Sequence, residues 1–434
     1  MRMKKVQKQL FVFVTISLLI ALVGTYIGSI YRYTSFEYAR QYGFSDGVID
    51  EYTLKSYLSR AVTQAEYLTD YRFISDVNYG DRSDDTRMLQ SIGAKFIGRA
   101  IYQWNRPEIF NDPDFLMEAQ KRIEVYHAVD SDVVFQAAIF EIVSTKVNQV
   151  PIPAWMFEEF DLPIENRNFD YERMIDPYGK FVNHWGEGAS VPDITRLETQ
   201  LFFYYMARNY LEIGIEAIHF GQVELMAMND REQNYSSWDS LLTRIRAAAL
   251  TYARRGTVII DGHLPMEVGY TLKVDDRLIF DFVSFPIRPI EMIFQSGKVS
   301  LMMLNPLAIY GKTRGGITPS GYFVQRSQYL VEFDNWGISD RPGKLNLFDG
   351  FIWGYDEISW FASRNASERN EFLIYAYEWI NEHDQYGNLQ MPGSRVSCLS
   401  TGERVQFRAN SIAVCPDCGN IEDTIWRLWS LSDK

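Results

Sequence analysis

The chain has 434 residues, of which 47% are hydrophobic and 23% charged, so its composition is that of a folded protein and excludes a largely disordered one. The formal net charge is −13. Because the first 36 residues hold five basic side chains and no acid, the remainder carries −18. Such an acidic body argues against nucleic-acid binding, since affinity for phosphates comes from clustered Lys and Arg.

Residues 10–31 form an uncharged, apolar run that is long enough for a helix to cross a bilayer. Lys4, Lys5 and Lys8 precede the run, and positively charged flanks stay on the cytoplasmic side. The sequence therefore predicts a basic flank and membrane anchor over residues 1–36, with the body outside the cytoplasm. A cleaved signal peptide is the alternative, and it would make the body a secreted one.

The body is predicted to alternate helices and strands after a helical lead-in over 37–90. Helical spacing covers 44–70, and a polar turn follows at 78–86. Apolar strands are predicted at 95–104, 132–143, 215–225, 257–263, 278–285, 299–304, 329–336 and 351–360. Helices are predicted at 115–128, 194–213, 238–255 and 368–383, and a long irregular stretch fills 145–192.

Eight apolar strands, many of them followed by a helix, predict an α/β fold: a (β/α)₈, TIM-like barrel over residues 91–385. Strands that are buried on both faces are typical of a parallel sheet covered by helices. A doubly wound open sheet is the rival fold. Against it, no G-x-G-x-x-G follows the first predicted strand, and no Walker A motif occurs.

The C-terminal tail, 386–434, contains the three cysteines of the chain. Cys415 and Cys418 form a C-x-x-C, and Cys398 lies upstream. A structural disulfide that joins Cys398 to Cys415 or Cys418 suits a protein outside the cytoplasm. Zinc is the alternative, but a second cysteine pair is missing. Trp426 and Trp429 are predicted to anchor the tail beneath the barrel.

Acids lie at the predicted C-terminal strand ends, where barrels of this kind place their catalytic groups. Glu141 ends the second predicted strand, Glu224 the third and Glu332 the seventh, and Glu357 lies in the eighth. Each acid alone is equally suited to a helix cap or a salt bridge. Polar residues predicted to bind substrate share these strands: Gln222, Asp261, His263 and Asp334.

Tryptophans are predicted at the same rim. Trp104 ends the first predicted strand, Trp336 the seventh and Trp360 the eighth, and Trp155 and Trp185 lie in the long loop after the second. Flat aromatic faces beside carboxylates suit sugar rings, because one face of a sugar ring is apolar while its hydroxyls need polar partners. Some of these residues are expected to be core instead, since aromatic side chains bury large areas.

An exported, Trp-rich, acidic barrel with Glu at two separated strand ends resembles the (β/α)₈-barrel glycoside hydrolases, especially the retaining enzymes. The resemblance is architectural and covers roughly residues 90–385. It implies a carbohydrate substrate and no cofactor, with Glu332 as nucleophile and Glu224 as acid/base, and Glu357 and Glu141 as substitutes. Two features depart from it: Val223 stands where those enzymes commonly have Asn, and Glu224 falls on the third predicted strand rather than the fourth. Either the prediction misses a strand within 145–192, or Glu224 does not correspond to the acid/base residue of those enzymes.

Three functions stay open at this point. The first is a membrane-tethered glycoside hydrolase that acts on a poly- or oligosaccharide. The second is a non-catalytic carbohydrate-binding barrel, which gains if the rim acids pair with Arg99, Arg288 or Arg326. The third is a carboxylate-rich, metal-dependent hydrolase that would use His219, Asp261, His263 and Asp281. Five His and no H-x-H or H-E-x-x-H weigh against a zinc site.

Overall fold

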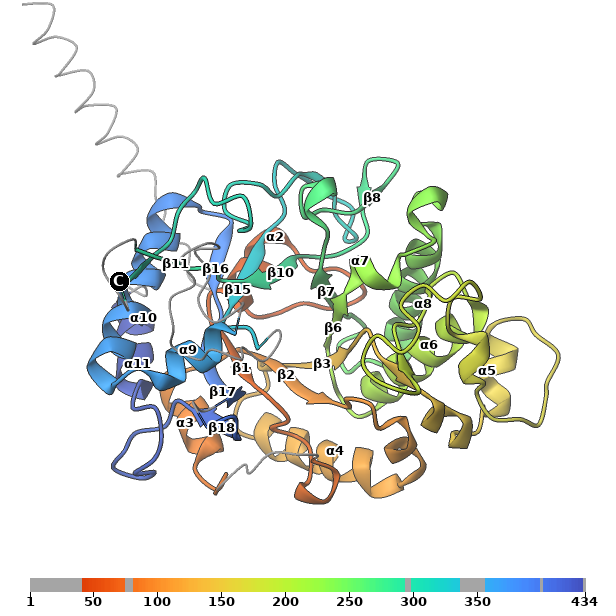
Figure 1. Cartoon of the computed structure of the whole chain (residues 1–434), viewed down its shortest axis with the longest axis horizontal. Coiled ribbons are helices and arrows are strands. Elements are labelled where there is room, and N and C mark those ends of the chain that lie inside the picture. The colour runs from red at the N-terminus through yellow and green to blue at the C-terminus, as the bar shows by residue number, and fades with distance from the viewer. Residues whose placement is uncertain (1–40, 75–80, 293–297, 336–355, 399–400, 432–434) are drawn as a thin grey trace, which may run out of the picture. The chain divides into compact units, whose positions relative to one another are not determined.

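The computed structural model describes residues 41–74, 81–292, 298–335, 356–398 and 401–431. Within them, eight parallel strand positions follow one another around a common core (Figure 1). They are β1 (Ala61–Gln64), β2 (Phe96–Tyr102), β3 (Val134–Ile139), β6 (Ala217–Gln222), β7 (Ile259–His263), β10 (Val283–Pro286), β15 (Tyr329–Glu332) and the consecutive β16 (Gly387–Leu389) and β17 (Met391–Cys398).

The ring of strands closes at two places. The chain 387–398 pairs first with β15 and then, after the single residue Gln390, with β1, so it bridges the two parallel sheets. On the other side, the backbone N–H of Asp281, just before β10, donates to the carbonyl of Ile260 in β7 at 2.8 Å. The predicted α/β barrel is therefore confirmed.

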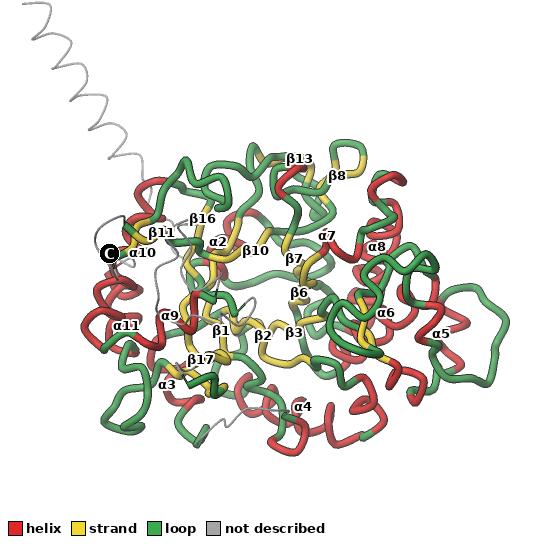
Figure 2. Tube along the Cα trace, in the orientation of Figure 1, coloured by secondary structure: helices red, strands yellow, loops and turns green. Residues whose placement is uncertain are grey.

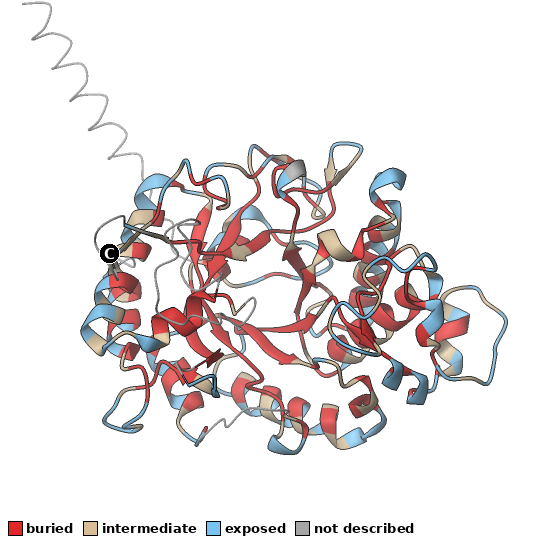
Figure 3. Ribbon diagram, in the orientation of Figure 1, coloured by how far each residue is buried: buried red, intermediate tan, exposed pale blue. Residues whose placement is uncertain are grey.

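Helices surround the strands, which are buried almost throughout, as expected for a sheet covered on its outer face (Figure 3). They are α2 (Glu51–Leu58), α3 (Asp85–Ile92), α4 (Pro113–His127), α6 (Leu197–Glu212), α8 (Ser236–Tyr252), α9 (Glu357–Ser363), α10 (Ala366–His383) and α11 (Glu422–Leu431). Helix α10 begins with a capping box, in which Asn365 and Glu368 each satisfy the other's backbone N–H.

The connections on either side of β10 depart from the regular pattern (Figure 2). In the described residues they hold short strands in place of α-helices. One small sheet contains β8 (Lys273–Val274), β9 (Arg277–Leu278), β13 (Gly316–Ile317) and β14 (Phe323–Val324), and a ribbon pairs β11 (Ile290–Glu291) with β12 (Val299–Ser300). The remaining elements are β4 (Val143–Ser144), β5 (Ala189–Ser190), α5 (Ala154–Glu159), α7 (Val223–Met226) and β18 (Arg404–Arg408), with 3₁₀ turns at Tyr71–Phe73, Pro107–Asn111, Thr145–Gln149, Tyr171–Arg173, Arg231–Gln233 and Met266–Val268.

Two barrel strands, one towards each end of the chain, differ from the prediction. The predicted helix 44–70 is wrong in its second half, because the first barrel strand, β1, lies there. The eighth strand lies in the predicted tail, so the barrel extends beyond 91–385 on both sides. With β1 counted, β6 is the fourth strand of the ring. The missed strand thus precedes the first predicted one and does not lie in 145–192.

Two predicted strands are not barrel strands. Within 299–304, only Val299–Ser300 is extended, and it pairs antiparallel with β11. Within 351–360, residues 351–355 lie outside the described residues, and α9 starts at Glu357 because the Asp356 side chain caps the N–H of Ser359 at 3.1 Å.

The tail also differs from the prediction. The disulfide joins Cys415 to Cys418, so the predicted bridge to Cys398 is wrong. Cys398 is held instead at the end of β17, opposite Arg404 of β18. Trp429 is fully buried and anchors α11 as predicted, whereas Trp426 is exposed.

No helix within the described residues is long and apolar enough to cross a membrane. The predicted anchor, 10–31, lies outside those residues.

Candidate functional site

Glu332, the last residue of β15, is fully buried at the C-terminal end of the barrel. Its Oε2 accepts from Arg99 Nε at 3.1 Å and from Arg395 Nη1 at 2.5 Å. Its Oε1 contacts Arg99 Nη2 and lies 3.0 Å from His263 Nε2. Burial alone would raise the pKa of this carboxyl, but the charges of Arg99 and Arg395 hold it well below its usual range. With two partners on each oxygen, Glu332 has no oxygen open for attack on a substrate, which counts against the predicted nucleophile role.

A bulge in β2 aims Arg99 at Glu332. The pairing of β2 with β3 shifts register between Ile97 and Ile101, and Arg99 has a φ of +55°, which a non-glycine residue rarely adopts. The preceding Gly98 leaves room for Gln390, whose Nε2 would lie 2.1 Å from a Cβ at that position. The sequence signal for Arg99 is this Gly next to an arginine inside an otherwise apolar strand.

Asp261 and His219 form a second polar cluster inside the barrel. Asp261 Oδ1 accepts from Gln136 Nε2 at 2.7 Å, and Oδ2 accepts from Ser284 Oγ at 2.6 Å and lies 2.9 Å from His219 Nδ1. Burial raises the pKa of Asp261 to about 7 and lowers the pKa of His219 well below its usual value. Ser284 and Asp261 both face Nδ1 of the imidazole, so this is not the arrangement of a Ser-His-Asp triad, in which serine meets the opposite nitrogen.

The predicted metal-binding set is brought together only in part: His219 Nδ1 lies 2.9 Å from Asp261 Oδ2 and its ring centre lies 5.0 Å from that of His263, whereas Asp281 is held elsewhere. Asp281 lies before β10, and its Oδ2 accepts from Ile260 N and from Arg246 Nη2, each at 2.9 Å. Arg246 belongs to α8, outside the strands. Among the described residues, no group of three or more His, Cys, Asp or Glu is placed to hold a metal ion.

Asp334 and Glu357 form the acid cluster of the rim: Asp334 follows the end of β15, and Glu357 begins helix α9. Asp334 Oδ1 accepts from Arg395 Nη2 at 2.6 Å, so one guanidinium holds both Glu332 and Asp334. Asp334 Oδ2 accepts no hydrogen bond from a described residue. Glu357 Oε1 accepts from Arg288 Nη1 at 2.8 Å, and within the described part of the chain its buried Oε2 has no partner.

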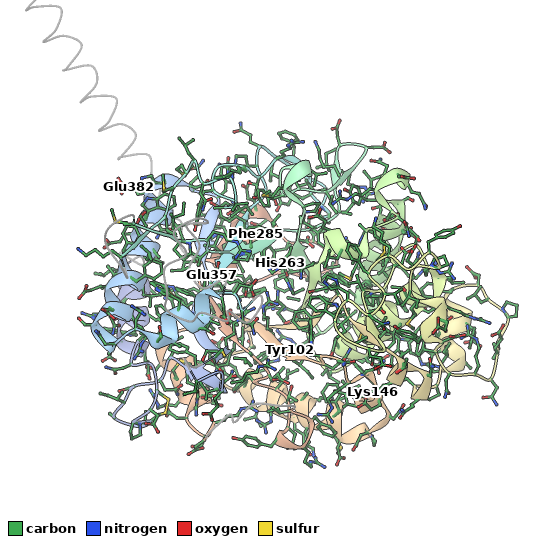
Figure 4. The ribbon with its side chains drawn as sticks, in the orientation of Figure 1. Tyr102, Lys146, His263, Phe285, Glu357 and Glu382 are labelled. Atoms are coloured by element: carbon green, nitrogen blue, oxygen red, sulfur yellow. A yellow bond between two sulfur atoms is a disulfide. The ribbon has the colours of Figure 1, made fainter. Side chains whose placement is uncertain are left out.

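The pKa of Glu357 is raised to about 8, first by burial and further by the negative charge of Asp334, while Arg288 opposes the shift. This pKa favours the protonated form of Glu357 at neutral pH, next to a second acid. Arg288, the partner of Glu357, also leads towards His263. Its guanidinium lies 5.6 Å from the centre of the Phe285 ring, and the centre of that ring lies 6.2 Å from the centre of the His263 ring. In Figure 4, His263 and Phe285 are labelled next to each other near the middle of the molecule, Glu357 lies to their left, and Glu382 lies at the upper left edge.

Glu141 follows β3 and is held by the next strand of the ring. Its Oε2 accepts from the backbone N–H of Gln222 at 2.8 Å and its Oε1 from Gln222 Nε2 at 2.9 Å. The carboxylate lies so close to β6 that a Cβ on Gly221 would approach Oε2 to 1.9 Å. The absence of a side chain at Gly221 thus leaves the space that the Glu141 carboxylate occupies.

We expect Gly221→Ala to lower the free energy of unfolding by about 1–3 kcal/mol, because the methyl group forces Glu141 or the backbone to move. Chemical denaturation measures the change. Gly43→Ala is the matched control, since nothing lies within 4 Å of a Cβ there and it should change stability by less than about 0.5 kcal/mol. Equal effects of the two substitutions would contradict the close approach.

One predicted tryptophan is half exposed beside Glu141. Trp104 is 39% exposed and meets the rings of Trp185 and Phe140 edge-on at 5.2 and 5.5 Å. Trp185 Nε1 donates to the carbonyl of Glu141 at 2.8 Å. This aromatic surface, Trp104 with Trp185 and Phe140, is where a sugar ring would find an apolar face.

The other predicted tryptophans lie elsewhere. Trp360 is 4% exposed and contacts Phe372 with ring centres 4.9 Å apart, so its predicted substrate contact is wrong: the segment is helix α9, and Trp360 faces the core. Trp155 stacks on Tyr205 of α6 and is not at the rim. Trp336 lies outside the described residues.

Glu224 is on the helical turn α7 and not on a strand, so it does not share a face with Gln222 by strand alternation. Its side chain is 43% exposed and forms an ion pair with Arg231. In the described part of the chain, no hydrogen bond or ion pair connects Glu224 to Glu332. The predicted pairing of these two glutamates therefore finds no support in the contacts of either.

No protein-family model matches the chain, and no curated protein matches its sequence. Solved structures of glycoside hydrolases do match it. A debranching enzyme from Nostoc punctiforme is 12% identical, with 56% of this chain and 53% of that chain covered and a TM-score of 0.31. Trehalose-6-phosphate hydrolase from Bacillus licheniformis is 10% identical, with 77% of this chain and 64% of that chain covered and a TM-score of 0.39. Isomaltulose synthase from Klebsiella sp. is 10% identical, with 64% of this chain and 58% of that chain covered and a TM-score of 0.35.

The chain thus spans less than two thirds of the length of each of these three proteins. These solved structures are of the class that the sequence resembles, glycoside hydrolases without a named family. At such identities and TM-scores, the chemistry of this chain has to be inferred from its own residues.

Proposed function

We propose that the protein is a glycoside hydrolase that cleaves a poly- or oligosaccharide at the C-terminal end of the barrel. In this proposal Glu357 is the general acid and Asp334 the ionised carboxylate that attacks the sugar or activates water. The observation that carries it is the acid cluster: a carboxyl with a pKa of about 8 and an uncommitted oxygen next to an acid held by an arginine. Glycosidic cleavage requires such a pair, one carboxyl protonated and one ionised.

Neighbouring side chains have supporting roles in this mechanism. Arg395 donates to Asp334 Oδ1 and fixes that oxygen, which leaves Oδ2 for the reaction. Glu332 neutralises Arg99 and part of Arg395, so it positions the cluster and does not react. Arg288 orients Glu357 through Oε1, which leaves Oε2 as the oxygen that carries the transferable proton.

The proposal also places the enzyme outside the cytoplasm, tethered by the apolar run 10–31. Its support is the sequence pattern described above, and the test is the location of a C-terminally tagged full-length chain. Protease treatment of intact cells should digest an extracytoplasmic body and spare a cytoplasmic one.

Asp334→Asn tests the reaction itself. We expect the wild-type chain to release reducing ends from at least one member of a panel of polysaccharides and aryl glycosides, and the variant to lose that release. Glu382→Gln is the matched control, because Glu382 is an exposed acid on α10 that lies apart from Glu357 in Figure 4. Full activity of Asp334→Asn would overturn the assignment of Asp334.

A non-catalytic carbohydrate-binding barrel is the second candidate, and specific ion pairs favour it. Glu332 pairs with Arg99 and Glu357 with Arg288, two of the pairings named above as favouring this function. Arg326 pairs with Asp384, which lies before β16 and away from the rim. Sugar binding without turnover across the panel, with loss of binding in Trp104→Ala, would decide for this candidate.

A further inference from the structure

A cavity of about 460 Å³ lies beside helices α5 and α6, apart from the acid cluster. Three arginines line it: Arg167, Arg173 and Arg196. Two acids, Glu165 and Glu198, also line it. The volume is in the range of pockets that hold small molecules.

Arg167 forms ion pairs with both acids of the cavity wall. Its two Nη atoms donate to the two oxygens of the buried Glu198 at 2.6 and 3.0 Å, and its Nε donates to Glu165 at 2.5 Å. This fork also fixes the loop that carries it, because Glu198 Oε1 accepts the backbone N–H of Asp170 at 2.9 Å. Both lining acids are therefore committed to Arg167.

The three lining arginines exceed the two lining acids by one positive charge. Arg196 Nε donates to the carbonyl of Arg173 at 3.2 Å, which brings the two residues together, and Arg196 forms no ion pair with a described acid. Arg173 meets only Asp170 among the described acids, with Nε 3.2 Å from Oδ2 and both side chains exposed. Asp170, which is solvated, offsets that excess, and Arg196 is the lining guanidinium without a carboxylate partner among the described residues.

We infer that this cavity binds a small oxyanion, a carboxylate or a phosphate, carried on a molecule with an apolar part. Guanidinium groups match the geometry of both anions. The apolar part of the ligand is accommodated by Leu162, Pro163 and Leu197, which line the same cavity. The first turn of α6, which begins at Leu197, adds a favourable dipole for negative charge.

Titration calorimetry on the full chain tests the inference with four probes: inorganic phosphate, acetate, glucuronate and neutral glucose. At least one of the anions should bind and be weakened tenfold or more by Arg196→Gln and by Arg173→Gln, while glucose should show no dependence on these residues. Tighter binding of glucuronate than of phosphate identifies a sugar acid as the ligand type, and the reverse order identifies a phosphate.

Arg427→Gln is the matched control, because Arg427 is an exposed arginine of α11 whose side chain bonds only its own helix among the described residues. A denaturation curve of each variant checks that it is folded. No anion binding in the millimolar range, or unchanged binding by folded Arg196→Gln, would overturn the inference. Hydrolysis of a neutral substrate should be the same in Arg196→Gln and wild type, so failure of this site and failure of the proposed function are distinguishable.

Discussion

Glu357→Gln is expected to lower kcat on glycosides with poor leaving groups by about 10²- to 10⁴-fold, the usual contribution of a positioned general acid. Glutamine keeps the size of the side chain and a hydrogen-bond donor, but it cannot transfer a proton to the departing oxygen. An aryl glycoside with a strongly acidic phenol leaves without that proton. Activity of the variant on such a substrate should therefore be close to that of the wild type.

The pH profile gives an independent sign of the same proton. With a pKa of about 8, Glu357 loses its acid form above that pH, so kcat/KM of the wild type should fall there. On a glycoside with a poor leaving group, the fall should be present in the control Glu382→Gln and absent from the residual activity of Glu357→Gln. A variant that is equally slow on both classes of substrate, in a folded protein, would contradict the role of general acid.

The raised pKa also makes a prediction about stability. A carboxyl that binds its proton more tightly in the folded than in the unfolded chain loses its stabilising contribution as the pH rises from the ordinary 4.5 towards 8. The free energy of unfolding of the wild type should therefore fall across this window by more than that of Glu357→Gln. Denaturant titrations at pH 5 and pH 8 measure the difference, and parallel behaviour of the two chains would contradict the pKa shift.

The barrel was predictable where its strands are long and apolar. β2, β3, β6, β7 and β15 all fall within predicted strands, because a run of buried side chains on both faces leaves a clear pattern. β1 has only four residues, too few for a period to emerge. β17 contains Pro392, Gly393 and Arg395, which hide a strand that is buried throughout.

The rim acids were predictable and the arginines that control them were not. Glu332 and Asp334 follow from the rule that barrel strands place functional groups at their C-terminal ends, whereas Glu357 falls in a predicted strand and is the first residue of helix α9. Arg99 is 233 residues from Glu332 in the sequence, and Arg395 is 63 residues from it. Such pairings depend on the tertiary structure, so the spacing of residues along the sequence does not predict them. The consequence is large, because these arginines decide which carboxyl is saturated and which retains a reactive oxygen.

Glu332→Gln is expected to have the largest effect on stability, a loss of about 3–5 kcal/mol in the free energy of unfolding at neutral pH. Removing the charge leaves Arg99 buried without its carboxylate, and an uncompensated buried charge is costly. Asp334 still holds Arg395, so the penalty is concentrated on Arg99. The double variant Glu332→Leu with Arg99→Met, which removes both charges, should therefore be more stable than Glu332→Gln alone.

The pH dependence of this loss separates a charge effect from a packing effect. The pKa of Glu332 is lower in the folded chain than its ordinary value of 4.5, so its contribution to stability is present above pH 4.5 and is lost as the pH falls through the folded value. The deficit of Glu332→Gln relative to wild type should therefore be full at pH 7 and shrink in acid. Glu224→Gln is the matched control, since its exposed pair with Arg231 should contribute less than about 1 kcal/mol. A deficit that stays constant down to low pH would mean that Glu332 stabilises the barrel by shape and hydrogen bonding, and the electrostatic account of the rim would then fail with it.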